Sequence, residues 1–259
     1  MQAGARRGHL SVLERIQRAL DGALAPWVVG AITAALVWWM WGGLAMPGTY
    51  HDERAYLVQA RLLATFSWTA PAPPIPLFWE MPHLFVEPRI FARYPPGHSL
   101  ALVPGIWFGL PGLVPMLLAG VFAGIVYSLA RTISGPFVAL GTWGLWTVAP
   151  TTLDWHSSYF SETTSALCWL AALTLLHRWA REPRPWHLPT LVAAMACLGI
   201  TRPVTGLALL GPVTVVVLLV SWRRRSMQGW LPSAAIGLAI CAIVPYWSYA
   251  TMGTVRSLP

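Results

Sequence analysis

The chain has 259 residues, of which 56% are hydrophobic and only 10% are charged, and it contains 16 tryptophans. Because charged residues make up about a quarter of an ordinary soluble domain, this composition excludes soluble enzymes, nucleic-acid-binding proteins and disordered tails, and it places the chain in a membrane. The formal net charge of +8 comes from 17 arginines, with no lysine, against 9 acids. We interpret this charge through membrane topology rather than through a nucleic-acid partner.

Residues 1–25 predict a basic amphipathic segment on the cytoplasmic side. Arginines and apolar residues recur there at helical spacing, which is typical of a helix lying on a membrane surface; they are Arg6, Arg7, Arg15 and Arg18 with Leu10, Leu13, Ile16 and Leu20. Trp27 to Met46 follows without a charge. This run is longer than the apolar core of a signal peptide, so it indicates an uncleaved first span.

The next segment, residues 47–110, is predicted to be a large outer loop that contains amphipathic interfacial helices. Its clearest helical pattern runs from His51 to Ala64. The stretch from Ser99 to Ala130 is ambiguous, because either an interfacial helix precedes one span or two short spans meet at 109–112. One span leaves 11 of the 17 arginines on the cytoplasmic side, whereas two spans leave only six there. The positive-inside rule therefore favours one span.

Further uncharged runs complete the prediction of an all-α, polytopic helical membrane protein with about seven transmembrane spans, whose membrane module covers 26–259. These runs are Pro111–Ala130, Gly135–Leu153, Thr163–Leu176, Leu188–Thr201, Pro203–Trp222 and Trp230–Ala250. Almost no ionisable residue lies at mid-membrane depth, which disfavours an ion-coupled transporter. Polar residues gather in the outer loops instead, so we expect a site at the membrane surface.

Acidic residues occur at two places in these outer loops. Asp52 and Glu53 open the helical pattern that follows the first span. Either they complement the dipole of a helix N-terminus, or they include a general base at the mouth of a site. Glu162 precedes the fourth span and leaves a similar choice between an acid at a helix start and a second acid that faces Asp52 across a cleft.

Two further segments are candidates for binding a lipid headgroup. The run Arg93-Tyr94-Pro95-Pro96-Gly97-His98 is either a rigid connector or the floor of a headgroup site, with Arg93 or His98 near a phosphate. Arg202 lies at the outer end of two apolar runs, against the positive-inside bias. It is either an interfacial arginine whose charged end reaches water or a phosphate clamp, since a guanidinium fork suits phosphate oxygens.

Taken in order, these segments resemble the GT-C superfamily of membrane glycosyltransferases, in particular its bacterial branch similar to dolichyl-phosphate-mannose protein mannosyltransferases, glycosyltransferase family 39. The resemblance covers roughly 26–259. It rests on Asp52-Glu53 with Tyr56, Gln59 and Ala60, on Tyr94-Pro-Pro-Gly97, on Ser158-Tyr159-Phe160-Ser161-Glu162 and on Thr201-Arg202-Pro203. Relatives in this group are usually longer, so the resemblance implies that the chain is an N-terminal part.

The resemblance implies transfer of a sugar from a polyprenyl-phosphate donor to an acceptor protein, lipid or glycan, with inversion at the anomeric carbon. The reaction is expected on the outer face of a bacterial inner membrane, with the N-terminus in the cytoplasm. By position, Asp52 is the base, Glu53 is a neighbour that tunes it, and Glu162 is the second outer acid. Substrate binding falls to Arg54, Tyr56, Arg93, Tyr94, His98, Tyr159 and Arg202.

The resemblance leaves the cofactor open, because some members of the superfamily need a divalent metal ion and others do not. The acids in this chain show no metal-ligand spacing, so no cofactor is assigned. Two alternatives to an enzyme also stay open. One is a non-catalytic lipid-binding or assembly protein of the same fold, and the other is a transporter for a lipid-linked sugar.

Overall fold

The structure is a computed structural model that describes residues 11–42 and 48–255. Parts of three sequence predictions lie outside these residues. They are Arg6 and Arg7 of the basic segment, the end of the first span after Gly42, and the outer tail beyond Val255.

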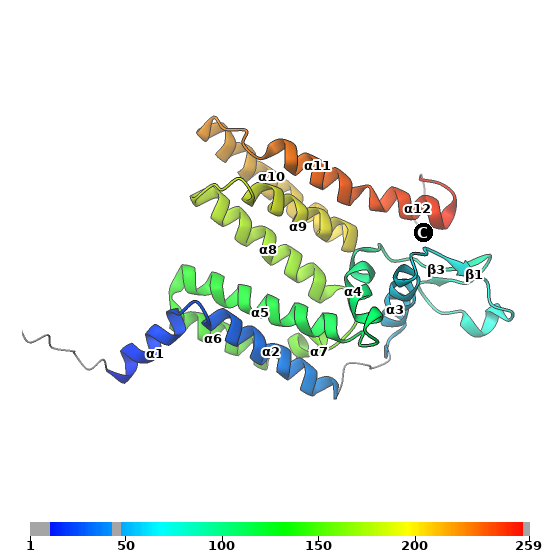
Figure 1. Ribbon diagram of the computed structural model, residues 1–259, viewed down its shortest axis with the longest axis horizontal. Coiled ribbons are helices and arrows are strands. Elements are labelled where there is room, and N and C mark those ends of the chain that lie inside the picture. The colour runs from blue at the N-terminus through cyan, green and yellow to red at the C-terminus, as the bar shows by residue number, and fades with distance from the viewer. Residues whose placement is uncertain (1–10, 43–47, 256–259) are drawn as a thin grey trace, which may run out of the picture.

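Long helices form the body of the molecule and lie side by side between two ends (Figure 1). They are α2 (Ala25–Trp41), α5 (Leu113–Ser134), α6 (Pro136–Val148), α8 (Glu162–Arg181), α9 (His187–Thr201), α10 (Pro203–Arg224) and α11 (Trp230–Cys241). Shorter helices adjoin three of them: α1 (Val12–Asp21) precedes α2, α7 (Pro150–His156) follows α6, and α12 (Ile243–Met252) follows α11. The mostly helical fold is therefore confirmed.

Within the described residues, three helical stretches are long and apolar enough to cross a membrane, namely α5, α10 and the combined stretch Trp230–Met252. The bent pair of α1 and α2 is a fourth candidate. Seven spans are therefore not confirmed. α6 and α9 have 13 and 15 residues, which gives roughly 20 Å of helix against about 30 Å of hydrocarbon. α8 is longer, but polar residues occupy both of its ends.

The loop between α2 and α5 folds at one end of the bundle, to the right in Figure 1. Its first helix, α3 (His51–Ala64), buries one face, as the amphipathic pattern predicts. Its second helix, α4 (Gly97–Trp107), ends before the break at 109–112. This arrangement agrees with an interfacial helix that precedes a single span.

Three short strands between α3 and α4 correct the all-α prediction. β1 (Ala70–Pro71) and β2 (Leu84–Phe85) both pair antiparallel with β3 (Arg89–Ala92), in the order β1-β3-β2. One turn of 3-10 helix, η1 (Pro76–Trp79), lies between β1 and β2. Strands of two to four residues are too short to show the alternation from which a strand is predicted.

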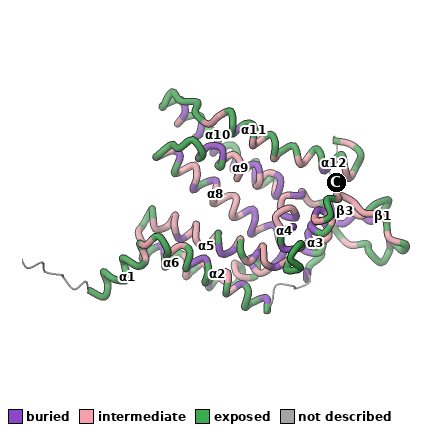
Figure 2. The backbone as a smooth tube through the Cα atoms, in the orientation of Figure 1, coloured by how far each residue is buried: buried purple, intermediate pink, exposed green. Residues whose placement is uncertain are grey.

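Buried residues lie where helices meet, and large apolar side chains remain exposed on the outer faces (Figure 2). One buried cluster joins α8, α9 and α10, and another joins α3 and α4 to Tyr159. α2 and α5 approach most closely through two glycines, since a Cβ on Gly30 would lie 2.7 Å from the carbonyl oxygen of Gly120. Small residues at helix contacts and an apolar exterior are both typical of helices in lipid.

Candidate active site

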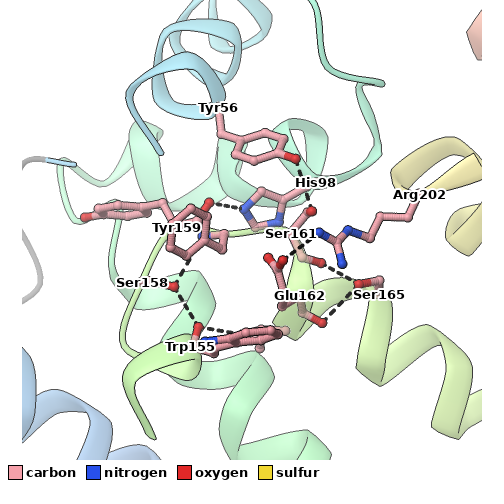
Figure 3. A network of polar contacts seen from close by, with 11 residues as sticks. Tyr56, His98, Trp155, Ser158, Tyr159, Ser161, Glu162, Ser165 and Arg202 are labelled. Carbon is pink, nitrogen blue, oxygen red and sulfur yellow. Dashed lines mark hydrogen bonds and ion pairs between the residues drawn. The ribbon is translucent and has the colours of Figure 1, made fainter. Parts of the chain in front are cut away.

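The four polar segments of the sequence meet at the same end of the bundle. Figure 3 shows side chains from α3, α4, the loop before α8 and the start of α10 in one network of polar contacts. Residues as far apart in sequence as Tyr56 and Ser161 are in direct contact there. The fold therefore brings together five residues that the sequence singled out separately, namely Tyr56, His98, Tyr159, Glu162 and Arg202.

Asp52 lies in the first turn of α3 and faces the small sheet. Its Oδ1 is 3.2 Å from Nε2 of His83, and the two side chains are 41% and 42% exposed. A polar contact this exposed contributes little to stability. Asp52 is therefore a carboxylate that both solvent and a ligand can reach.

Glu53 is buried and fastens the start of α3 to the loop before α8. Its Oε2 accepts hydrogen bonds from the backbone N–H groups of Thr49 and Tyr50, at 2.7 and 2.9 Å. Its Oε1 accepts one from the backbone N–H of Tyr159 at 2.8 Å. Both oxygens are thus occupied by the backbone, so Glu53 positions its neighbours.

Tyr56 lies at the centre of an aromatic cluster between the acidic segments. Its ring stacks on Tyr94 at 4.5 Å and meets the edge of His98 at 4.8 Å. Its hydroxyl donates to Oγ of Ser161 at 3.1 Å. Burial raises the pKa of Tyr56 to about 12, so the phenol stays protonated at neutral pH. Burial and the neighbouring Asp52 also raise the pKa of Tyr94.

His98 is completely buried and both of its ring nitrogens are occupied. Nε2 lies 2.8 Å from the carbonyl oxygen of Tyr159, and Nδ1 lies 2.8 Å from Oγ1 of Thr164. Because a carbonyl oxygen only accepts, Nε2 carries the proton and Nδ1 accepts from the threonine. Burial lowers the pKa of His98 to about 4, so the ring is neutral. With both nitrogens used, His98 acts by holding α4 against α8.

The turn Pro95-Pro96-Gly97 packs against the end of α9. A Cβ on Gly97 would collide with Oγ1 of Thr201 and would lie 2.8 Å from the carbonyl group of Ile200. Only glycine permits this approach without a shift of the backbone. The contact sets the distance between α4 and the chain at Arg202, the residue that follows α9.

Glu162 and Arg202 form the ion pair of the site. Nη2 of Arg202 donates to Oε1 of Glu162 at 2.5 Å, and the side chains are 42% and 20% exposed for the arginine and the glutamate. The second oxygen, Oε2 of Glu162, is buried and has no hydrogen-bond partner among the described residues. The pair therefore keeps one unused acceptor and a half-exposed guanidinium.

A cavity of about 720 Å³ opens beside this pair. It lies between α5 and α7 on one side and α8 and α10 on the other, and Trp155, His156 and Trp169 contribute to its walls. Seven of its 12 lining residues are polar or charged. Its volume falls within the range of small-molecule sites, about 300–1,000 Å³.

Glu162 and Arg202 are the predicted site residues that line the cavity, whereas the other predicted site residues, all within the described ranges, do not line it. Arg93 is exposed and its guanidinium lies 4.5 Å above the ring of Phe85 in the small sheet. Arg54 is also exposed, and its Nε donates to the carbonyl oxygen of Gly48. Tyr159 is buried at the centre of the network, where its ring packs 5.0 Å from Trp41.

Several residues of the site escaped the sequence analysis. His83 pairs with Asp52 across about thirty positions of loop, and only the sheet brings it there. His156 and Trp155 stand in the polar run before Glu162, which is the one signal that could have identified them. Trp169 is on the same helix as Glu162, seven positions further on, and helical spacing places both residues on one face.

The described residues contain no group of three or more His, Cys, Asp or Glu side chains that could hold a metal ion. The divalent ion that the resemblance allows thus has no protein ligand set in residues 11–42 and 48–255, and we derive no step that uses it.

One comparison with known proteins gives a result. Residues 111–249 match the model of a family described as dolichyl-phosphate-mannose-protein mannosyltransferase. The matched region contains Glu162, Arg202 and every residue that lines the 720 Å³ cavity, and it begins after the loop that carries Asp52. Neither a curated protein nor a solved structure matches the chain.

Proposed function

Because the chain belongs to the dolichyl-phosphate-mannose-protein mannosyltransferase family, a family of GT-C glycosyltransferases in the membrane, we propose that it transfers a sugar from a polyprenyl-phosphate donor. The acceptor is a hydroxyl or amine group of a protein, lipid or glycan on the outer side of the membrane. The transfer inverts the configuration of the anomeric carbon. The ion pair of Glu162 and Arg202 in the wall of a cavity lined by polar and aromatic residues is the observation that carries this proposal.

In the proposed step, the acceptor oxygen or nitrogen attacks the anomeric carbon while the bond from that carbon to the phosphate oxygen breaks. The acceptor loses a proton to Asp52, and the polyprenyl phosphate leaves with the bonding electrons. Arg202 stabilises the charge that grows on this phosphate, because a guanidinium binds phosphate oxygens as a fork. Glu162 holds the guanidinium in place through its Oε1.

The position of Asp52 and the effect of its charge on nearby tyrosines support its assignment as the base. The carboxylate lies at the end of the bundle that contains the polar network, and its charge raises the pKa of both Tyr56 and Tyr94. The charges of Glu162 and Arg202 also shift the pKa of Tyr56, the glutamate upward and the arginine downward. Asp52 and the ion pair thus both lie near Tyr56, which supports a reaction region beside the stacked tyrosines.

The distribution of arginines supports an outer position for the site. At the end opposite the network, Arg131 donates to the carbonyls of the α1–α2 junction, and Arg224 donates to the end of α8. Further arginines lie at the same end; they are Arg178, Arg181, Arg184, Arg223 and Arg225. The positive-inside rule assigns such an end to the cytoplasm, which leaves the site on the outer face.

A donor-consumption assay tests the proposal. Membranes that contain the chain are supplied with polyprenyl-phosphate mannose carrying a radioactive sugar, and the release of label from the lipid is followed. We expect Asp52→Asn to slow transfer about 10²–10⁴-fold, the usual contribution of a general base. Asp154→Asn is the matched control, since Asp154 is an exposed aspartate in neighbouring α7. Wild-type transfer by Asp52→Asn would eliminate the base assignment.

A further inference from the structure

Two residues that line the cavity beside Arg202 each have a buried polar atom that lacks a partner among the described residues. Oε2 of Glu162 and Nδ1 of His156 are both buried, and neither has a hydrogen-bond partner among the described residues. His156 as a whole is only 6% exposed. Leaving such groups unpaired is unfavourable, so two of them in residues that line one cavity point to a polar ligand there.

The ring of His156 is held in place by aromatic neighbours. Its centroid lies 5.0 Å from the ring of Trp146 and 5.5 Å from the ring of Phe122. These contacts give the imidazole a fixed orientation in the cavity wall without using its nitrogens. A rigid polar group set among apolar rings is suited to selecting one ligand orientation.

The other wall residues restrict the chemistry of the ligand. Trp155 and Trp169 offer apolar ring surface, while Thr151, Thr152, Ser165 and Thr205 carry hydroxyl groups. A lipid chain has no donor for Glu162 or His156. A phosphate ion alone suits Arg202, but it has no apolar face that packs on Trp155 and Trp169. A sugar ring fits both requirements, because its hydroxyls donate and accept hydrogen bonds and its C–H faces pack on aromatic rings.

We propose that this cavity holds the sugar of the polyprenyl-phosphate donor, and that His156 is a residue that recognises this sugar. The inference rests on the proposed function. One sugar hydroxyl bonds the imidazole of His156, and another bonds the carboxylate of Glu162. Arg202 at the same cavity binds the phosphate that links the sugar to the lipid. The cavity thus distinguishes a glycosylated lipid phosphate from the bare lipid phosphate.

The test measures binding of two lipids to the detergent-purified chain by native mass spectrometry. One lipid is polyprenyl-phosphate mannose and the other is the corresponding polyprenyl phosphate without sugar. We expect the wild type to retain the mannosylated lipid about tenfold more tightly. His156→Phe keeps a ring of similar size but removes both nitrogens, so it should abolish this preference while retention of the bare lipid is unchanged. His156→Gln should restore part of the preference.

His177→Phe is the matched control, because His177 on α8 also has a buried nitrogen without a partner among the described residues but lines a cleft at the opposite end. It should keep the wild-type preference. A preference that survives in His156→Phe overturns the inference, as does an equal loss of both lipids. If the wild type retains neither lipid, the proposed function itself fails. Retention of both lipids with no preference overturns only the assignment of the cavity.

Discussion

Two hollows of nearly equal volume flank α10 and differ in chemistry. The cavity beside Arg202 has a volume of about 720 Å³, and a groove between α9, α10 and α11 has about 700 Å³. The cavity contains a carboxylate, a guanidinium and an imidazole. In the groove, by contrast, Thr214 and Ser233 are the only hydroxyl-bearing residues among 21 lining residues, and none is charged. Volume alone therefore does not identify the site.

The contrast arises from the two faces of one helix. Arg202 and Thr205 of the α10 region line the cavity, whereas Leu207, Leu210 and Val213 line the groove. α10 packs on α9 through glycine, since a Cβ on Gly206 would lie 2.9 Å from the Cα of Gly199. The chain thus brings polar and apolar surfaces close together without mixing them, and it is the polar surface that carries the proposed chemistry.

Among the variants that test this contrast, Arg202→Ala should have the largest effect. We expect Arg202→Ala to slow sugar transfer about 10²–10³-fold, as removal of a group that stabilises transition-state charge usually does. Leu210→Ala, on the groove side of the same helix, should change transfer less than threefold. Both rates come from the donor-consumption assay, normalised to the amount of folded protein. Equal losses in the two variants would mean that the two hollows do not differ in function.

The helical body of the fold was predictable because apolar runs of spanning length are a strong signal. The arginines favour a single span around α4 and α5, and of these two helices α5 alone is long enough to cross a membrane, while the side that each loop faces stays a prediction. The number of transmembrane spans could not be predicted as well as the helical fold. The breaks at Pro150 and after Trp41 shorten helices that the sequence presents as continuous apolar runs.

The sequence allowed the polar residues of the site to be predicted, but not which of them contact one another. Asp52, Glu162 and Arg202 stand out as charges in an apolar chain, whereas the partner of each follows from folding over long sequence distances. His156 and Trp169 become functional candidates only when a cavity is known. Glu53 and His98 are residue types that often act in catalysis. Here they are buried and their polar atoms already have hydrogen-bond partners, which gives them a positioning role.

A second prediction sharpens the contrast at the loop before α8, which Glu53 holds through the backbone of Tyr159. Glu53→Gln places an amide N–H₂ against a backbone N–H, because both carboxylate oxygens of Glu53 accept from backbone donors. We expect a loss of about 1–3 kcal/mol in the free energy of unfolding. Hydrogen exchange should rise in 155–162, which borders the cavity, and stay unchanged in α11, which borders the groove. Glu80→Gln, at an exposed glutamate, is the control, and increased exchange in α11 would contradict the assignment.

The smallest effect concerns pH and again involves only the polar side. The pKa of His98 falls from its ordinary value of 6.5 to about 4 in the fold because the ring is buried. Between these two pH values the unfolded chain takes up a proton that the folded chain does not, so the stabilisation is complete above pH 6.5 and is lost as the pH falls toward 4.

His98→Gln should keep the bonds to Tyr159 and Thr164, since an amide both donates and accepts. The variant should therefore melt close to the wild type at pH 7 and show a shallower fall in melting temperature between pH 6.5 and 5. Other histidines contribute equally to both proteins, so the difference between the two slopes isolates His98. Parallel slopes would show that the fold tolerates a protonated His98. The contact of an uncharged His98 ring with α8 would then no longer explain how α4 is held in place.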